Sequence, residues 1–235
     1  MATTLTDIFR EEVLQLDGVG RFSPSRRFTS IYHRFDPADR IFFVSSGLVK
    51  LFNRGKDGKE VILRIVSAGD WFGEDTLTED PRRGTAAEIL QEAVIFSIPR
   101  SVLLSFAEGR PGFWHLLASS LSGRQRFAEM KNEMLCTEDV ETRIVHFVRT
   151  LAQRLKQDGQ SSDFMIPLSQ SELASLIGAT RETTSTTLNM MARKGMLKLG
   201  RRLLIVPSIE GLEPATVGDA ELQTFSASAP GGARS

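Results

Sequence analysis

The sequence predicts an α+β protein in which an antiparallel β-roll of the jelly-roll kind precedes a long helix and a winged helix-turn-helix. Short apolar segments separated by turns run from residue 22 to residue 98. A continuous helical pattern follows at residues 113–136, and two short capped helices with a basic hairpin occupy residues 169–206. With 235 residues, 41% of them hydrophobic, the chain is long enough for one or two packed domains.

The first twenty residues have the spacing of a helix. Their apolar positions recur every three or four residues, as is typical of one buried helix face, at Leu5, Ile8, Phe9, Val13 and Leu16. We therefore expect residues 1–20 to form a lead-in helix before the roll.

The roll is predicted over residues 21–112 from a succession of strands and turns. The apolar residues on either side of Gly47 are expected to form two strands, with Gly47 as a turn or a bulge. An Asp-Gly turn at Gly58 predicts a hairpin whose returning strand is residues 61–66. Residues 86–98 are expected to add several strands separated by polar breaks. Many short strands at this spacing are typical of an antiparallel roll.

A long helix is expected over residues 113–137 as the dimerisation helix. Its seam repeats at heptad-like intervals. The predicted dimer interface consists of Leu117, Leu121, Arg124, Ala128, Lys131 and Leu135. A second apolar side contains Leu116, Phe127, Met130 and Met134. A helix that is apolar on two sides needs two partners, so one side is expected to cover the roll and the other to pair with a second subunit. The alternative is a buried core helix in a monomer.

Residues 138–212 are expected to form one further unit. It begins with an amphipathic helix over residues 138–156 and continues with a short strand at residues 164–168. Residues 213–235 are rich in Ala, Ser, Gly and Pro, and this composition predicts a disordered tail.

A helix-turn-helix signal lies inside this last unit. Ser169 and Glu172 have the spacing of a capping box, and Gly178 ends the helix that they begin. Thr180 supplies a hydroxyl cap for a second helix. The hairpin that follows, residues 198–206, is basic at its turn and is read as a wing.

The second helix of this pair carries five consecutive hydroxyl residues, at positions 183–187, after Arg181 and Glu182. Ser and Thr are mediocre helix formers, so such a run is explained if short hydroxyls must fit a major groove and meet bases or phosphates. The alternative is a small helical domain with a polar surface.

The charge is balanced overall but unevenly distributed. The chain has 29 basic and 29 acidic residues, which gives a net charge of zero. Residues 1–136 are neutral, residues 137–206 carry a net charge of +3 and residues 207–235 a net charge of −3. Between Ser169 and Pro207 the net charge is +4, and this places a basic patch where phosphates could be met.

Several functional classes are excluded by composition. Cys136 is the only cysteine, so one chain can form neither an intrachain disulfide nor a cysteine-held iron–sulfur cluster. No apolar run approaches a membrane span, and the first residues lack a signal-peptide pattern, so we expect a cytoplasmic protein without a membrane partner. No constellation of catalytic or metal-ligating residues is present, so an enzyme is not expected.

The order of roll, long helix and winged helix-turn-helix resembles the CRP/FNR family of bacterial transcription regulators over residues 22–208. The most specific stretches are Gly-Lys-Glu-Val-Ile-Leu at residues 58–63, Gly-Asp-Trp-Phe-Gly-Glu at 69–74 and Ile-Gly-Ala-Thr-Arg-Glu-Thr at 177–183. The resemblance implies a cyclic-nucleotide-binding-like sensor roll and a homodimer on double-stranded DNA. Its two recognition helices would read a near-palindromic site with half-sites about 34 Å apart.

The resemblance also implies an effector site in the roll, for which a cyclic nucleotide is one candidate. Gly73 and Glu74 match the family's ribose-binding pair, and Arg83 matches its phosphate-binding arginine. Gly84 replaces the serine beside that arginine, with Thr85 adjacent. Two further positions match those that meet adenine, and they hold Ala128 and Glu129 in place of two small hydroxyl residues. This difference argues against cyclic AMP, while another effector or none stays open.

For DNA, the resemblance places the reading positions at the start of the second helix. Arg suits guanine and Glu can accept from cytosine, whereas Thr186 replaces the arginine that the family usually has. The predicted DNA-contacting residues are Ser169, Gln170, Thr180, Arg181, Glu182, Ser185, Thr186, Arg201 and Arg202. RNA polymerase is an expected partner if the protein is an activator. The alternative function is a cyclic-nucleotide-binding regulator that acts mainly through a protein partner.

Overall fold

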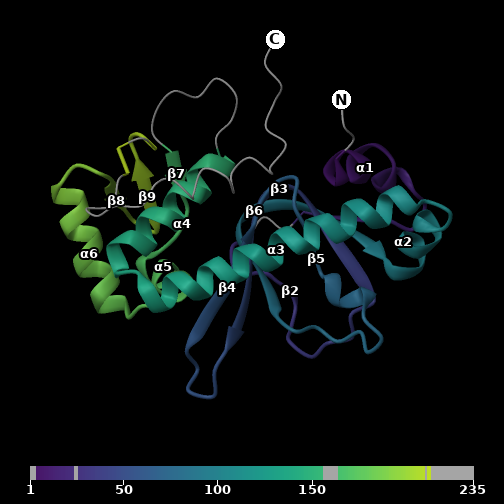
Figure 1. Ribbon diagram of the computed structural model, residues 1–235, viewed down its shortest axis with the longest axis horizontal. Helices are drawn as coiled ribbons and strands as arrows, with labels where there is room; N and C mark the ends of the chain where they lie inside the picture. Colours follow the sequence, from purple (N-terminus) through teal and green to yellow (C-terminus); the bar gives the residue numbers. More distant parts are fainter. Residues whose placement is uncertain (1–3, 24–25, 156–163, 210, 213–235) are drawn as a thin grey trace, which may run out of the picture.

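A computed structural model describes residues 4–23, 26–155, 164–209 and 211–212. The antiparallel sheet of the roll lies beneath a long helix, and the C-terminal helices with their small sheet stand at the far end of that helix (Figure 1). The predicted α+β fold class is confirmed. The predicted loop around residues 158–163 and the predicted tail at 213–235 fall outside the described residues.

The roll is built on one antiparallel sheet of six strands. These are β1 (Gly20–Phe22), β2 (Ser30–Tyr32), β3 (Arg40–Arg54), β4 (Glu60–Val66), β5 (Trp71–Phe72) and β6 (Ala86–Pro99). The central order is β1-β6-β3-β4, while β2 pairs with β6 and β5 pairs with β3. A short 3-10 helix, η2 (Glu74–Leu77), follows β5.

Two details of the strand prediction were wrong. The residues around Gly47 form the single 15-residue strand β3, and residues 86–98 belong to the single 14-residue strand β6. Of the two expectations for Gly47, a turn or a bulge, the bulge is confirmed, because the β3–β6 register shifts on both sides of this residue. Its φ is +85°, and a Cβ there would lie 2.1 Å from the Glu92 carbonyl oxygen, so only glycine fits.

Helices close the N-terminal end of the roll. They are α1 (Leu5–Glu11), the 3-10 helix η1 (Val13–Gln15), α2 (Arg100–Ala107) and the beginning of α3 (Pro111–Thr137). Thr4 caps α1 through a capping box with Asp7. An aromatic cluster joins these elements to the sheet, because Phe9 stacks on Phe43 at 5.5 Å between ring centroids and meets Phe113 edge-on at 6.3 Å.

The C-terminal unit combines three helices with a small sheet. The helices are α4 (Val140–Leu155), α5 (Gln170–Ile177) and α6 (Arg181–Arg193). The strands are β7 (Phe164–Ile166), β8 (Lys198–Gly200) and β9 (Leu203–Val206), in the order β7-β9-β8. The predicted apolar face of α4 is buried, with Ile144 and Val148 fully enclosed.

The roll and the C-terminal unit share one apolar cluster. Leu48, Phe52 and Ile62 of β3 and β4 belong to the same cluster as Ile144 of α4 and Leu173 of α5. The helix-turn-helix is therefore docked on its own roll, with α5 against β4. Within the described parts of the chain, no helix is both long enough and apolar enough to span a bilayer.

Candidate nucleic-acid interface and roll site

The first helix of the pair begins as the sequence predicts. The Ser169 hydroxyl accepts from the Glu172 backbone N–H at 3.2 Å, and the Glu172 carboxylate accepts from the Ser169 N–H at 2.7 Å. Burial of Glu172 opposes its ionisation, but the hydrogen bonds from Ser169 and the charge of Arg27 keep the pKa of this carboxyl below its usual value. The capping box thus fixes the start of α5.

The second helix is also capped as predicted. Gly178 takes φ +68° at the end of α5, and the Thr180 hydroxyl accepts from the Thr183 N–H at 3.1 Å. The expectation that the hydroxyl residues at positions 183–187 all face a DNA major groove was wrong for one of them. Thr184 is fully buried and donates to the Thr180 carbonyl at 2.8 Å, so its hydroxyl completes the helix and does not face a groove.

A groove of about 360 Å³ brings four of the predicted DNA-contacting residues together. Ser169 and Gln170 come from the start of α5, Arg181 from the start of α6 and Arg202 from the β8–β9 turn. The N-termini of helices carry free N–H groups and a partial positive charge, and two arginines stand beside them here. The groove is therefore suited to a phosphate.

The remaining predicted contact residues surround this groove on the surface. Thr180, Glu182, Thr186 and Arg201 are exposed, and Ser185 is half-buried. No structural feature distinguishes base contacts from phosphate contacts among them, and their roles remain predictions.

In the roll, Glu74 is engaged in ion pairs. Its carboxylate lies 3.1 Å from Arg124 Nη1 on α3 and 3.6 Å from Arg64 Nη2 on β4. Burial opposes ionisation of Glu74, yet these two guanidinium groups lower the pKa of its carboxyl. Burial also lowers the pKa of Arg124 to about 10. The charge of Glu74 thus ties the roll to the long helix.

Arg83, the predicted phosphate-binding residue, is only 2% exposed and is engaged with its own chain. Its Nη2 donates to the Arg40 carbonyl at 2.6 Å and its Nη1 to the Gly73 carbonyl at 3.2 Å. The guanidinium also lies 4.3 Å from the ring centroid of Tyr32. Gly73 has φ +89°, and a Cβ there would lie 2.8 Å from Arg83 Nη1, so this close contact requires glycine.

The neighbouring positions are engaged as well. The Gly84 carbonyl accepts a hydrogen bond from Asn53 Nδ2 at 3.3 Å, and the Asp75 carboxylate lies beside Gly84. A Cβ at Gly84 would lie 3.3 Å from Asp75 Oδ1, where the family's serine would have to fit. Burial, followed by the charge of Glu74, raises the pKa of Asp75. These residues do not fit a cyclic nucleotide phosphate as the family's pair would, because Gly84 has no hydroxyl and the Asp75 carboxylate lies beside it.

The two positions predicted for the base of a nucleotide are both exposed on α3. Ala128 has no polar side chain, and Glu129 accepts a hydrogen bond from Gln125 Nε2 at 3.0 Å. Neither supplies a hydroxyl donor toward the roll, which agrees with the misfit at the phosphate end.

The residues of the predicted dimer seam lie in two different environments, some against the roll and some at the surface. Three of its members are engaged with the chain's own roll, which is a correction to the prediction that they face a partner. Leu117 is buried in the aromatic cluster, Arg124 Nη2 donates to the Trp71 carbonyl at 2.6 Å, and Lys131 Nζ donates to the Ile62 carbonyl at 2.8 Å. Leu121 is half-buried, while Ala128 and Leu135 are exposed.

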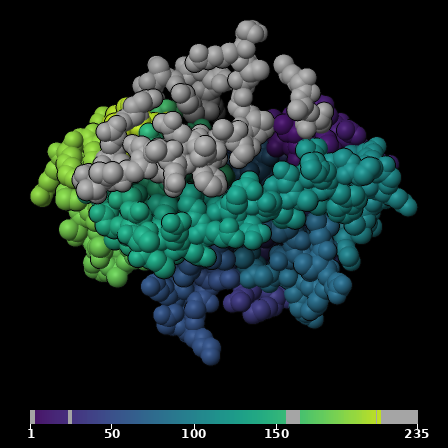
Figure 2. Space-filling view, viewed as in Figure 1, coloured from purple at the N-terminus to yellow at the C-terminus, as the bar shows by residue number. Residues whose placement is uncertain are grey.

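An exposed stripe on α3 adjoins this seam. It consists of Trp114, Ala118, Leu121, Gln125, Ala128, Asn132 and Leu135. Its positions alternate by four and three residues, so they follow one line along the helix. Trp114 and Leu135 at its two ends are 40% and 37% exposed. Figure 2 shows α3 uncovered across the front of the molecule. Four of these positions, Trp114, Ala118, Gln125 and Asn132, are outside the predicted seam, because two leucine-based repeats overlap on α3.

The three histidines and Cys136 show no ligand geometry. Cys136 is exposed, and burial together with the charge of Arg149 lowers the pKa of His146. Within the described residues, no group of three His, Cys, Asp or Glu side chains is placed to hold a metal ion.

Two family models match the chain. The model of the cyclic nucleotide-binding domain matches residues 25–110, and that of the Crp-like helix-turn-helix domain matches residues 142–215.

Relatives and solved structures agree with this. A CRP-like cAMP-activated global transcriptional regulator of Mycobacterium tuberculosis is 30% identical over 78% of this chain and 82% of its own length. The cyclic AMP receptor protein of Thermus thermophilus is 27% identical over 80% of this chain and 84% of its own. The structure of FixK2 from Bradyrhizobium japonicum is similar with a TM-score of 0.71 and 25% identity, covering 85% of this chain and 99% of the other.

The sensor-type roll, the long helix and the capped helix pair thus occur with the family's two domains in their usual order. The chain belongs to the CRP/FNR family of transcriptional regulators.

Proposed function

We propose that the protein is a homodimeric regulator that recognises a near-palindromic DNA site through α6. The observation that carries this proposal is the groove that joins the starts of α5 and α6 to the wing. Residues 138–212 would form the DNA-binding domain, residues 21–112 the sensor roll and residues 113–137 the dimerisation helix.

In this proposal the phosphate backbone is held at the groove and the bases are read beside it. Gln170 offers its backbone N–H group at the start of α5, and Arg202 supplies a charge from the wing. Arg181 and Glu182 are exposed in the first turn of α6, where side chains of a recognition helix reach base edges. An arginine there suits guanine and a glutamate suits cytosine.

The exposed stripe of α3 is the proposed contact with a second copy. The stripe alternates apolar residues with Ala, Gln and Asn at heptad spacing, a pattern by which two such helices can pack along one line. A dimer about this stripe would present two α6 helices, as a site with two half-sites requires.

The roll is proposed to work without a cyclic nucleotide. Arg83 donates to the Gly73 and Arg40 carbonyls, Gly84 lacks the family's hydroxyl, and the Asp75 carboxylate adds a negative charge beside it. The roll would then serve to hold α3 and the DNA-binding domain, with DNA binding independent of cyclic AMP.

Selection of bound sequences from a random duplex pool tests the proposal. The wild type is expected to enrich a sequence with two inverted half-sites. The double variant Arg181→Ala, Glu182→Ala is expected to lose that preference, since each lost bidentate base contact costs about 1–3 kcal/mol. Arg193→Ala, at the other end of α6, is the matched control and should enrich the wild-type sequence. Enrichment of the same sequence by the double variant would contradict the assignment.

A further inference from the structure

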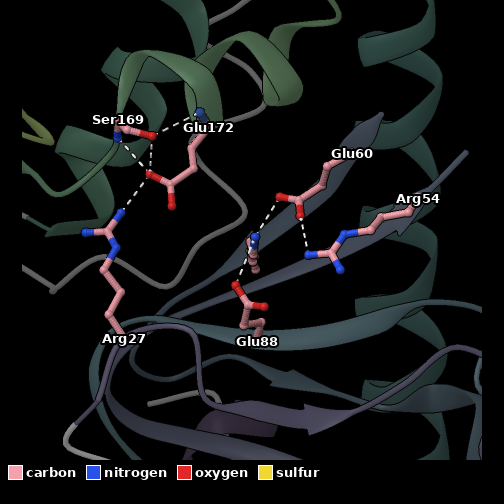
Figure 3. Close-up of polar contacts among 7 residues, drawn as sticks. Arg27, Arg54, Glu60, Glu88, Ser169 and Glu172 are labelled. Atoms are coloured by element: carbon pink, nitrogen blue, oxygen red, sulfur yellow. Dashed lines mark hydrogen bonds and ion pairs between the residues drawn. The ribbon is translucent and has the colours of Figure 1, made fainter. Parts of the chain in front are cut away.

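A second contact between the roll and the DNA-binding domain lies beside the groove. Arg27 Nη2 of the β1–β2 loop donates to Glu172 Oε2 at 2.7 Å, and the same oxygen accepts from Ser169 (Figure 3). The Arg27 and Glu172 side chains are 23% and 9% exposed. This ion pair therefore joins the roll to the residue that caps α5, and Ser169 itself lines the groove.

Phe28, next in the chain, faces three cations. The Arg202 guanidinium lies 5.1 Å from its ring centroid, that of Arg27 lies 5.4 Å away and Lys50 Nζ lies 5.9 Å away. Lys50 is itself fixed by ion pairs with Glu60 and Glu88 at 2.6 and 3.0 Å, which Figure 3 shows beside Arg54. The face of an aromatic ring attracts a cation within about 6 Å, so Phe28 holds the wing through Arg202.

The two contacting residues are both in the left-handed backbone region. Phe28 has φ +67° and Arg202 has φ +56°, a conformation that residues other than glycine rarely adopt. Such strain persists only where surrounding contacts maintain it, and it is concentrated at binding and switching sites. Here the contact between the two residues links one strained turn to the other.

Arg202 thus takes part in two features of the surface. It lines the groove that is suited to a phosphate, and it lies over Phe28 of the roll. We propose that Arg27 and Phe28 form an intramolecular latch that competes with the phosphates of DNA for Arg202 and so lowers the affinity of the protein for DNA. The inference rests on the proposed function and adds to it a residue pair of the roll that regulates the wing.

Because the competition is a linkage between two sites, it acts in both directions. DNA that takes Arg202 weakens the contact between roll and wing, and a change that loosens the latch strengthens DNA binding by the same factor. This gives the roll an influence on the DNA-binding domain that needs no ligand inside the roll.

The test compares two exposed phenylalanines, each with a positive φ and a guanidinium near its ring. Phe28→Ala removes the ring from Arg202, while Phe35→Ala is the control, because Phe35 is also exposed, has φ +73° and has a guanidinium, that of Arg34, 4.6 Å from its ring. Fluorescence anisotropy would measure binding of the full chain to a labelled duplex of random sequence over a range of salt. Phe28→Ala is expected to bind about two- to five-fold more tightly, the factor that one exposed cation–π contact supplies, and Phe35→Ala to bind like the wild type.

A second set of variants tests whether the effect of Phe28 on DNA affinity depends on Arg202. In Arg202→Ala, the further change Phe28→Ala is expected to leave the affinity unchanged, because the contested side chain is absent. Arg27→Gln, which keeps Phe28, should act in the same direction as Phe28→Ala. Melting curves of each variant establish that it is folded before binding is measured.

The outcomes separate the two proposals. Equal affinities of Phe28→Ala, Phe35→Ala and the wild type overturn the latch alone, as does a gain in affinity that persists in the Arg202→Ala background. Failure of the folded wild type to bind duplex DNA at low salt overturns the proposed function and, with it, the latch.

Discussion

The roll site and the groove of the DNA-binding domain differ in how much of their charge is used within the chain. At the roll site, Glu74 is paired with Arg64 and Arg124, and Arg83 donates to two backbone carbonyls. At the groove, Arg181 and Arg202 are exposed, and the Arg202 guanidinium lies over the ring of Phe28. Both sites are in a family fold, yet only the groove presents charges to a ligand.

If the roll works without a cyclic nucleotide, as proposed, this difference means that the family's ligand-binding residues are retained here for another purpose. Gly73, Glu74 and Arg83 match the family pattern, but here their polar atoms bind the roll together and attach it to α3. A sequence motif therefore indicates a site only when the partners of its side chains are known.

The first prediction concerns the pairing of two subunits, which brings two grooves to one DNA site. Ala128→Arg places a charge on the exposed stripe of α3 and is expected to yield monomers, measured by sedimentation velocity. Loss of the second half-site should lower affinity for a palindromic duplex by at least about 100-fold. Ser119→Arg, at an exposed position away from the stripe, is the control. A dimeric Ala128→Arg protein would disprove this interface.

The second prediction sharpens the comparison at the roll site. Glu74→Gln leaves Arg64 and Arg124 without their carboxylate and, because these side chains are partly exposed, is expected to lower the free energy of unfolding by about 1–3 kcal/mol. Glu182→Gln, an exposed change at the groove, should leave stability unaltered. Urea unfolding curves measure both. Equal stability of the two variants would show that the charge of Glu74 is not structural.

The third prediction concerns pH and Lys131, a buried cation that joins α3 to β4. Burial lowers the pKa of Lys131 to about 8, below its value of 10.5 in an unfolded chain. The unfolded chain then binds more protons between these two pH values, so the stability contributed at Lys131 rises as the pH increases from about 8 toward 10.5. The free energy of unfolding of the wild type is expected to increase relative to Lys131→Met over this range. A difference independent of pH would contradict the buried charge.

The fourth prediction has the smallest expected effect, which is none. Cyclic AMP at saturating concentration is expected to leave the melting temperature and the DNA affinity unchanged, because Arg83 is engaged with two backbone carbonyls and the Asp75 carboxylate lies beside Gly84. A ligand at 100 times its dissociation constant would stabilise the fold by about 2.7 kcal/mol, which thermal unfolding detects readily. Adenosine monophosphate is the control for non-specific nucleotide effects. A saturable rise in melting temperature with cyclic AMP alone would reopen the roll site.

The fold could be predicted where local signals and tertiary structure agree. The capping box at Ser169, the turn at Gly178 and the cap at Thr180 are local features, and each is present in the structure. The strand breaks predicted near Gly47 and within residues 86–98 were wrong, because a bulge interrupts the pattern of alternation without ending a strand.

The site was harder to predict than the fold, since it depends on partners distant in sequence. The engagement of Arg83 with the Arg40 carbonyl, and of Arg27 with Glu172, joins residues that no local pattern relates. The seam on α3 was only partly predicted for a similar reason. Spacing places a residue on a face of a helix, but only the packed roll decides that Lys131 faces inward and Ala128 outward.

The contact between Leu135 and Gly178 has a consequence for how the sequence can vary. A Cβ at Gly178 would lie 2.6 Å from Leu135 Cδ2, so the tip of α3 rests directly on the turn between α5 and α6. A larger residue at position 178 would have to displace Leu135 and also adopt φ +68°, which favours glycine. In an alignment of relatives that keep this docking, position 178 is expected to stay glycine.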